Sequence, residues 1–170
     1  MAEEISRAIR KLYEGSLEEK REAIRALVHA GDDAIEPLIE VLVEEEDNDI
    51  RWYASRALAR IGIPAIEPLL HVIERSEIGD ARRYAAAALG EIGEPAISPL
   101  LESLGSERAD VRGFASLALC RIGRPAVEPL LQVLDASEGV LHSCALLTLW
   151  KMGELGPETL QEHFKESPEK

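Results

Sequence analysis

The sequence predicts an all-α superhelix, a solenoid of about five helix pairs with a period of 30–31 residues. Seven of the nine prolines fill two slots, which lie two or six residues after a repeated glycine. Aromatic residues make up only 4% of the chain, which argues against a β-sandwich or barrel. The repeated glycines are spaced 31, 31, 30 and 30 residues apart, and they are Gly31, Gly62, Gly93, Gly123 and Gly153.

Each period is expected to hold two helices, of which the second has the clearer pattern. Asp49, Asp80 and Asp110 precede the apolar stripes of these second helices, and we expect them to cap free backbone N–H groups. Ser16 and Glu19 have the spacing of a capping box. The repeated glycine suits the left-handed residue that ends a helix. In the fourth unit the stripe has steps of 3, 1, 3, 1 and 3, formed by Val111, Phe114, Ala115, Ala118, Leu119 and Ile122.

The first helix of each unit begins at prolines. Pro64, Pro95 and Pro125 fit a first helical position, where no N–H group is needed. A second proline follows four residues later, and inside a regular helix it would remove a hydrogen bond. We therefore expect an irregular first turn, with regular helix from about the second proline onward. Small residues recur where helices must approach closely, namely Ala54, Ala85, Ala115 and Ala145.

We expect a single solenoid domain over residues 1–166. A helix at about residues 3–14 is the predicted N-terminal cap, with its apolar side facing inward. Residues 154–166 are the predicted C-terminal cap, and residues 167–170 are expected to be a frayed tail. The inward residues of the first cap are Ile5, Ile9, Leu12 and Tyr13.

The repeat has a recognisable motif, Gly-x-Pro-Ala-Ile-Glu-Pro-Leu-Leu followed by Val-Arg-x-x-Ala-x-x-Ala-Leu-x-x-Ile-Gly. Over roughly residues 17–153 it resembles the HEAT-like repeats of the phycobilisome-lyase type. This resemblance implies second helices that line a concave side. It also implies several functions, because such repeats occur in phycobilin lyase subunits, deoxyhypusine hydroxylase, prokaryotic proteins of unknown role and designed binding scaffolds. The hydroxylases hold two irons through paired His-Glu dipeptides, and this sequence has no such dipeptide.

The charge balance disfavours some classes of partner. The chain has 19 basic and 32 acidic residues, a net charge of −13, which repels nucleic acid and anionic lipid. Residues 1–50 alone have 6 basic and 15 acidic groups, a net charge of −9. No apolar run approaches the roughly 18 residues of a membrane helix, and the start has no signal core. We expect a cytoplasmic protein that binds neither nucleic acid nor membrane.

No pattern in the sequence predicts a catalytic, metal or cofactor site. Glu67, His71 and Glu74 have a spacing that can present metal ligands, but we expect a solvated outer face there. His142 and Cys144 lie two residues apart and point to different sides of a helix, so they do not predict a nucleophile. Cys144 falls in a slot expected to lie in the core. We therefore expect a protein that is not an enzyme.

One slot near the start of the second helices holds arginine in three units and histidine in the last. It predicts either an anion-binding ladder or structural bonds to carboxylates and carbonyls of the nearby loops, and we favour the structural bonds. The acidic run at residues 44–49 lacks the residue order of a calcium loop and is expected to be a solvated charge run. The slot holds Arg51, Arg82, Arg112 and His142.

The slots opposite the core stripe indicate where a partner would bind. They are basic near the N-terminus and apolar near the C-terminus, where Leu146 and its neighbours leave an apolar face. We expect a non-enzymatic scaffold that binds another protein or peptide. The alternatives are a lyase-like subunit or chaperone that holds a tetrapyrrole, a metal-dependent hydroxylase-like enzyme that the missing His-Glu pairs disfavour, and a homodimer formed through the C-terminal apolar face. The predicted contact residues are Trp52, Arg56, Arg83, Leu117, Leu147 and Trp150.

Overall fold

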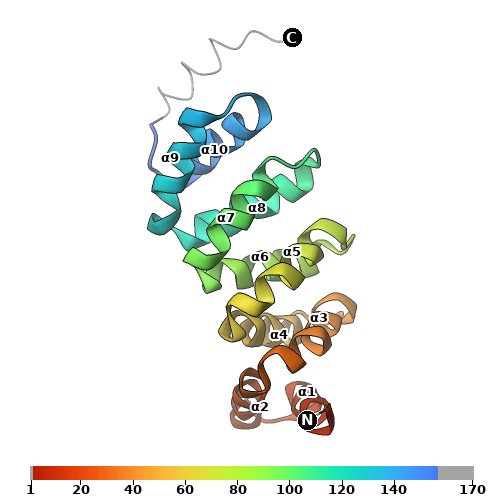
Figure 1. The fold of residues 1–170 in the computed structure, drawn as a ribbon. Coiled ribbons are helices and arrows are strands. Elements are labelled where there is room, and N and C mark those ends of the chain that lie inside the picture. Colours follow the sequence, from red (N-terminus) through yellow and green to blue (C-terminus); the bar gives the residue numbers. More distant parts are fainter. Residues whose placement is uncertain (1, 157–170) are drawn as a thin grey trace. The chain divides into compact units, whose positions relative to one another are not determined.

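The computed structural model describes residues 2–156, and within this range it contains helices and short connections but no strand (Figure 1). Over residues 2–156, ten α-helices follow one another as five pairs, which confirms the predicted all-α solenoid of helix pairs. The chain divides into two compact units, unit 1 over Met1–Ile92 and unit 2 over Gly93–Lys170. The predicted tail and residues 157–166 of the predicted C-terminal cap lie outside the described residues.

Unit 1 has three helix pairs, and unit 2 has two. In unit 1, α4 packs against both α2 and α6, so the second helices of successive pairs lie side by side. In unit 2, α8 contacts α10 in the same way. The helices of unit 1 are α1 (Ala2–Glu14), α2 (Leu17–Ala30), α3 (Ile35–Glu44), α4 (Asn48–Ile61), α5 (Ile66–Arg75) and α6 (Gly79–Ile92). Those of unit 2 are α7 (Ile97–Leu104), α8 (Ala109–Ile122), α9 (Val127–Ala136) and α10 (Gly139–Lys151).

The repeated glycines end the second helices, as predicted. Gly62 follows α4 with φ 86° and ψ −133°, and its N–H donates to the carbonyl of Leu58 at 3.2 Å. The positive φ was expected, but the backbone is in the mirror image of the extended region rather than in a left-handed helical turn. Side-chain-bearing residues rarely adopt this conformation, so the slot requires glycine. The other four repeated glycines also have positive φ values.

The prolines produce the expected irregular turn. Three-residue 3₁₀ turns, such as Ile63–Ala65, precede α5, α7 and α9. Regular helix then begins two residues before the second proline, somewhat earlier than predicted, as at Ile66 ahead of Pro68. The second proline thus becomes the third residue of the helix. Its missing N–H costs little there because the first four N–H groups of a helix have no partner within it.

The capping predictions were right for α2 and wrong for α4. Glu19 accepts the N–H of Ser16 at 2.8 Å, and Ser16 accepts the N–H of Glu19 at 3.4 Å, which completes the capping box. At α4 the cap is Asp47, whose carboxylate accepts the N–H of Asp49 at 2.8 Å. The helix begins at Asn48, so Asp49 already lies in its first turn.

Asp80 and Asp110 do not occupy the N-cap position either. Asp80 is the second residue of α6, which begins at Gly79. Asp110 is the second residue of α8, whose N-cap residue is Arg108. In each case the helix begins before the aspartate, which contributes a negative charge to the first turn. Such a charge interacts favourably with the positive end of the helix dipole. Asp110 also accepts the free N–H of Val111 at 2.9 Å, as expected of a side chain that caps such groups.

The repeated small and aliphatic slots form the core of each unit. The four predicted alanines are fully buried, and so is a leucine of each repeated second helix. Two placements were wrong. Tyr13 is 43% exposed rather than inward. The slot of Cys144, shared with Tyr53 and Phe114, is half-buried and lies at the edge of the core. The fully buried leucines are Leu27, Leu58, Leu89, Leu119 and Leu149.

Candidate partner-binding surfaces

Trp52 and Arg56 lie one turn apart on the exposed side of α4. The indole of Trp52 is 47% exposed and packs edge-on against Tyr53, with 5.0 Å between ring centroids. The guanidinium of Arg56 stands 5.6 Å from the centre of the Trp52 ring. Arg56 also forms a close ion pair with Glu91 of α6. The structure therefore brings two of the predicted contact residues together as one stacked pair.

A hollow of about 370 Å³ lies beside this pair, between α2 and α4. Trp52 and Arg56 line one wall, and Arg21 and Arg25 of α2 line the other. Arg60 continues the wall of α4 by one further turn. The predicted contact set missed the whole α2 side. The repeat could have revealed it, because Arg21 and Arg25 stand 31 residues before Trp52 and Arg56.

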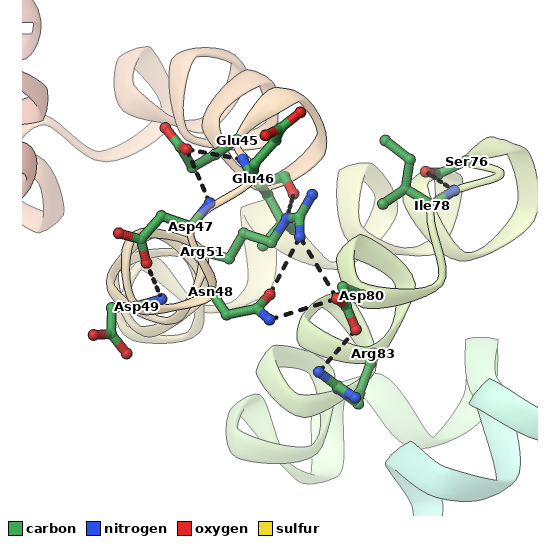
Figure 2. Close-up of polar contacts among 11 residues, drawn as sticks. Glu45, Glu46, Asp47, Asn48, Asp49, Arg51, Ser76, Ile78, Asp80 and Arg83 are labelled. Carbon is green, nitrogen blue, oxygen red and sulfur yellow. Dashed lines mark hydrogen bonds and ion pairs between the residues drawn. The ribbon is translucent and has the colours of Figure 1, made fainter.

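Arg83, another predicted contact residue, interacts with its own helix. It is on α6, where it binds Asp80 one turn earlier at 2.8 Å and lies over the ring of Tyr84 at 5.6 Å. Figure 2 shows that Asp80 also approaches Arg51, so Arg83 belongs to a polar cluster at the start of the second helices. Its side chain is 55% exposed. The structure thus pairs Arg83 with Asp80, in the first turn of α6.

The exposed face of unit 2 is apolar. Leu117 on α8 is 46% exposed, while Leu147 and Trp150 on α10 are 37% and 44% exposed. Leu117 and Leu147 occupy the same repeat slot, 30 residues apart, on two helices in contact. Leu146 is buried, contrary to the expectation that it would remain on the open face.

Small polar side chains join α8 to α10 beneath this apolar face. The hydroxyl of Thr148 donates to the carbonyl of Cys144 at 2.7 Å and forms a hydrogen bond of 2.9 Å with the hydroxyl of Ser116, and both Thr148 and Ser116 are buried. The thiol of Cys120 lies 3.9 Å from the carbonyl of Thr148, and burial raises the pKa of this thiol. A raised pKa keeps the thiol protonated, which makes Cys120 a poor nucleophile.

A comparison with models of known protein families shows the family to which this chain belongs. A family model described as HEAT repeats matches residues 7–77 and 66–150. The chain belongs to the HEAT repeat family. The helix pairs described above are therefore HEAT repeats, and the exposed slots lie on the second helices of these repeats. Among the described residues, no helix is both long and apolar enough to span a membrane.

The solved structures that resemble this HEAT repeat chain include two crystal structures of engineered proteins. The first has 18% sequence identity and a TM-score of 0.36, and the match covers 96% of this chain and 90% of the other. The second has 22% identity and a TM-score of 0.33, and the match covers 89% of this chain and 48% of the other. The comparison with curated proteins gave no match.

The basic slot of the HEAT repeats serves the structure, as predicted. The Nε of Arg51 donates to the carbonyl of Leu42 at 3.2 Å, and Nη1 donates to Asn48 at 3.2 Å (Figure 2). The same Nη1 lies 3.8 Å from Asp80 of the next repeat. Arg51 is buried, so these bonds replace the water that its guanidinium loses.

The slot has the same role in unit 2. Nη1 of Arg112 donates to the carbonyls of Ser106 and Glu107 at 2.7 and 2.9 Å. In the last repeat, Nδ1 of His142 lies 2.8 Å from the carbonyl of Leu134 and 3.0 Å from that of Ser137. Because carbonyls only accept, Nδ1 must be the protonated ring nitrogen. The side chain of His142 is therefore directed to the loop and not to Cys144.

The acidic run forms a structured turn. Glu45 accepts the N–H groups of Glu46 and Asp47 at 2.8 and 3.0 Å (Figure 2). The bond from Asp47 is the main cause that lowers the pKa of Glu45. Burial and the nearby Glu45 carboxylate raise the pKa of Tyr13 to about 12. These carboxylates therefore act within the fold of unit 1.

The possible metal set on α5 is spread over an exposed helix surface. Nε2 of His71 lies 3.8 Å from Glu67, and their side chains are 49% and 76% exposed. Within residues 2–156, no group of three or more His, Cys, Asp or Glu side chains is arranged to hold a metal ion. This finding agrees with a solvated outer face at these residues.

Proposed function

We propose that this HEAT repeat protein is a non-enzymatic scaffold that binds another protein or a peptide through the exposed sides of its second helices. The observation that carries the proposal is the set of large apolar side chains exposed on α4, α8 and α10. Trp52 and Trp150 are 47% and 44% exposed, although the chain has only two tryptophans. Tryptophan, with tyrosine and arginine, is enriched among residues that dominate binding energy.

The physical argument is the cost of that exposure. Burial of apolar surface is worth about 25 cal/mol per Å². Leu117, Leu147 and Trp150 stay exposed in unit 2, so folding does not gain the free energy of burying their remaining apolar surface. A partner that covers them would gain it without any change in the core, because Ala115 and Leu146 beneath are already buried.

The test is partner capture from a lysate of the native host. We expect that Trp150→Ala combined with Leu147→Ser abolishes capture and leaves the helical CD signal unchanged. The matched control combines Ile63→Ser with Ile78→Ser, which removes two exposed apolar side chains from the connections before α5 and α6, 67% and 40% exposed. Capture that survives the first pair of substitutions would overturn the assignment.

A second candidate is a lyase-like subunit or chaperone that holds a tetrapyrrole. It is favoured by the motif of the repeat, which is similar to HEAT-like repeats of the phycobilisome-lyase type. An absorbance titration with a bilin separates the two proposals. A spectral change at equimolar bilin supports the lyase-like role, and an unchanged spectrum removes it.

Self-association through the apolar face of unit 2 is the third arrangement. A second copy of the chain would then cover Leu147 and Trp150 in place of a different protein. Light scattering across a dilution series distinguishes the two cases. A mass of 18.7 kDa at every concentration supports the scaffold proposal, and a mass twice as large supports a homodimer.

A further inference from the structure

We infer that the hollow between α2 and α4 binds a short acidic peptide segment of another protein. One apolar side chain of the peptide would rest against Trp52, and carboxylates on either side of it would pair with the surrounding arginines. This inference rests on the proposed scaffold function and names the class of partner for unit 1.

The lining of the hollow combines an apolar floor with a basic rim. Ile24 is buried beneath it, and Tyr53 and Trp52 supply aromatic surface. Its volume of about 370 Å³ is at the lower end of the range of small ligand pockets, so it suits one or two side chains rather than a folded domain. None of the described residues that line it is acidic. The rim consists of Arg21, Arg25, Arg56 and Arg60.

The charge of the rim is only partly balanced. Glu18 lies 3.7 Å from Arg21 and 4.0 Å from Arg25, and all three side chains are more than 60% exposed. Such exposed pairs bind weakly. Arg56 is paired with Glu91, whereas no carboxylate of the described residues pairs with Arg60, which is exposed. Four guanidinium groups thus face two carboxylates, which leaves room for further anionic groups.

This local excess is opposite to the charge of the surrounding unit. Residues 1–92 contain 12 basic and 20 acidic groups, a net charge of −8. Charges further apart than about 8 Å are largely screened at physiological salt, so a ligand inside the hollow responds mainly to the four arginines. Charge complementarity therefore selects an acidic ligand at this place alone.

The aromatic part of the site is already ordered. Tyr53 meets Trp52 edge-on at an angle of 74°, and Arg56 covers the other part of the indole. A guanidinium stacked on a ring keeps its outer N–H groups available for a carboxylate. A peptide side chain that packs against Trp52 therefore places its neighbouring carboxylate near Arg56 without a rearrangement of the wall.

A peptide fits better than a nucleic acid. A nucleic acid strand carries a charge on every nucleotide and would extend beyond the hollow over a surface with a net negative charge. Glu18 and Glu91 lie at the sides of the hollow, where they would repel the next phosphates. A short peptide can instead confine its carboxylates to the four arginines.

The test uses the full chain and a fluorescein-labelled, amidated heptapeptide, Asp-Glu-Asp-Leu-Asp-Glu-Asp, in a fluorescence anisotropy titration. We expect saturable binding that weakens as salt is raised. Arg25→Glu with Arg60→Glu should weaken it about tenfold or more. The matched control, Arg10→Glu with Arg75→Glu, gives the same net charge outside the hollow and should change affinity by less than about twofold. CD spectra check that both variants are folded.

Glu91→Gln provides a change in the opposite direction. It removes the carboxylate that competes for Arg56, so it should strengthen binding about two- to fivefold. The peptide Asn-Gln-Asn-Leu-Asn-Gln-Asn, which has the same shape without charge, should bind at least tenfold more weakly. Equal binding of the two peptides, or equal loss with the control variant, would overturn the inference.

Two other results would overturn it in favour of different occupants. Tighter binding of a labelled oligothymidine than of the acidic heptapeptide would assign the hollow to nucleic acid. Self-association that disappears in the Arg25/Arg60 variant would assign it to a second copy of the chain. If the wild-type protein does not bind the heptapeptide but still captures a host partner, this inference fails and the scaffold proposal stands. Capture by the Leu147/Trp150 variant tests the scaffold function separately.

Discussion

The two units use the same repeat slot for opposite chemistry. In unit 1 the slot holds Arg25 and Arg56, which border a basic hollow. In unit 2 it holds Leu117 and Leu147, which form an exposed apolar face. The buried slots do not differ in this way, since each alanine and leucine there must fit a neighbouring helix. The core slots therefore determine the fold, and we propose that the exposed slots of the second helices determine what each unit binds.

Substitutions in the core slots should lower the free energy of unfolding the most, and by similar amounts in the two units. Leu58→Ala in unit 1 and Leu119→Ala in unit 2 each remove a fully buried side chain from the same slot. Each should lower the free energy of unfolding by about 2–5 kcal/mol. Urea denaturation followed by CD measures this loss. Leu117→Ala is the control on the exposed face, and a loss as large as that of Leu119→Ala would contradict the assignment of slots.

Substitutions in the basic slot should have the next largest effect on the free energy of unfolding. The effect should be larger for Arg51 than for His142. Arg51→Ala leaves the Leu42 carbonyl and Asn48 without a buried donor, so we expect a loss of about 1–3 kcal/mol. His142→Ala removes the donor that serves the carbonyls of Leu134 and Ser137, and it should cost less because that site is only half-buried. Equal midpoints of urea unfolding for Arg51→Ala and wild type would contradict a structural role.

Substitution of a repeated glycine tests the effect of backbone conformation on stability without a steric clash. Gly62→Ala places a side chain at φ 86°, where no neighbouring atom lies within 4 Å, so strain and not a clash is the cause of any loss. We expect a cost of about 1–2 kcal/mol. Gly113→Ala is the matched control, because Gly113 lies inside α8 with open space around it. It should be neutral or stabilising, since alanine favours helix.

The smallest effect on the free energy of unfolding should come from substitution of Glu45 in the acidic turn. The N–H groups of Asp47 and Glu46 hold the pKa of Glu45 below its ordinary value. Its carboxylate therefore stabilises the fold above the unfolded pKa of about 4.5, and this contribution is lost as pH falls through the lower folded pKa. The stability difference between wild type and Glu45→Gln should narrow on acidification, as measured by urea midpoints from about pH 7 to pH 3. A difference that does not change with pH would contradict this role.

The sequence contained most of the fold and only part of the candidate site. The glycine and proline slots predict helix ends because few backbone conformations accept Gly62 or Pro64. The capping residue of α4 was missed because Asp47 and Asp49 are equally good caps by type, and only the start of the helix separates them. The α2 wall of the hollow was missed because the comparison of exposed slots began at α4, although Arg21 and Arg25 occupy the same slots one repeat earlier.

The sequence predicted the exposure of some side chains of α10 correctly and that of others wrongly. Leu147 and Trp150 were correctly placed on the open side, while Leu146 is buried. Adjacent positions on a helix differ by 100°, and the packing of α10 against α8 decides which of them is covered. The Ser116–Thr148 bond beneath them fixes that packing, and no sequence period identifies such a bond.

The most direct test of the account is partner capture by three matched proteins, namely wild type, the Leu147→Ser/Trp150→Ala variant and the Ile63→Ser/Ile78→Ser control. Each is immobilised at equal density, exposed to the same host lysate, and compared by the amount of each protein retained. The account predicts a partner that is retained equally by wild type and control and is lost with the Leu147/Trp150 variant. Retention of the same proteins by all three would contradict binding through the exposed second helices.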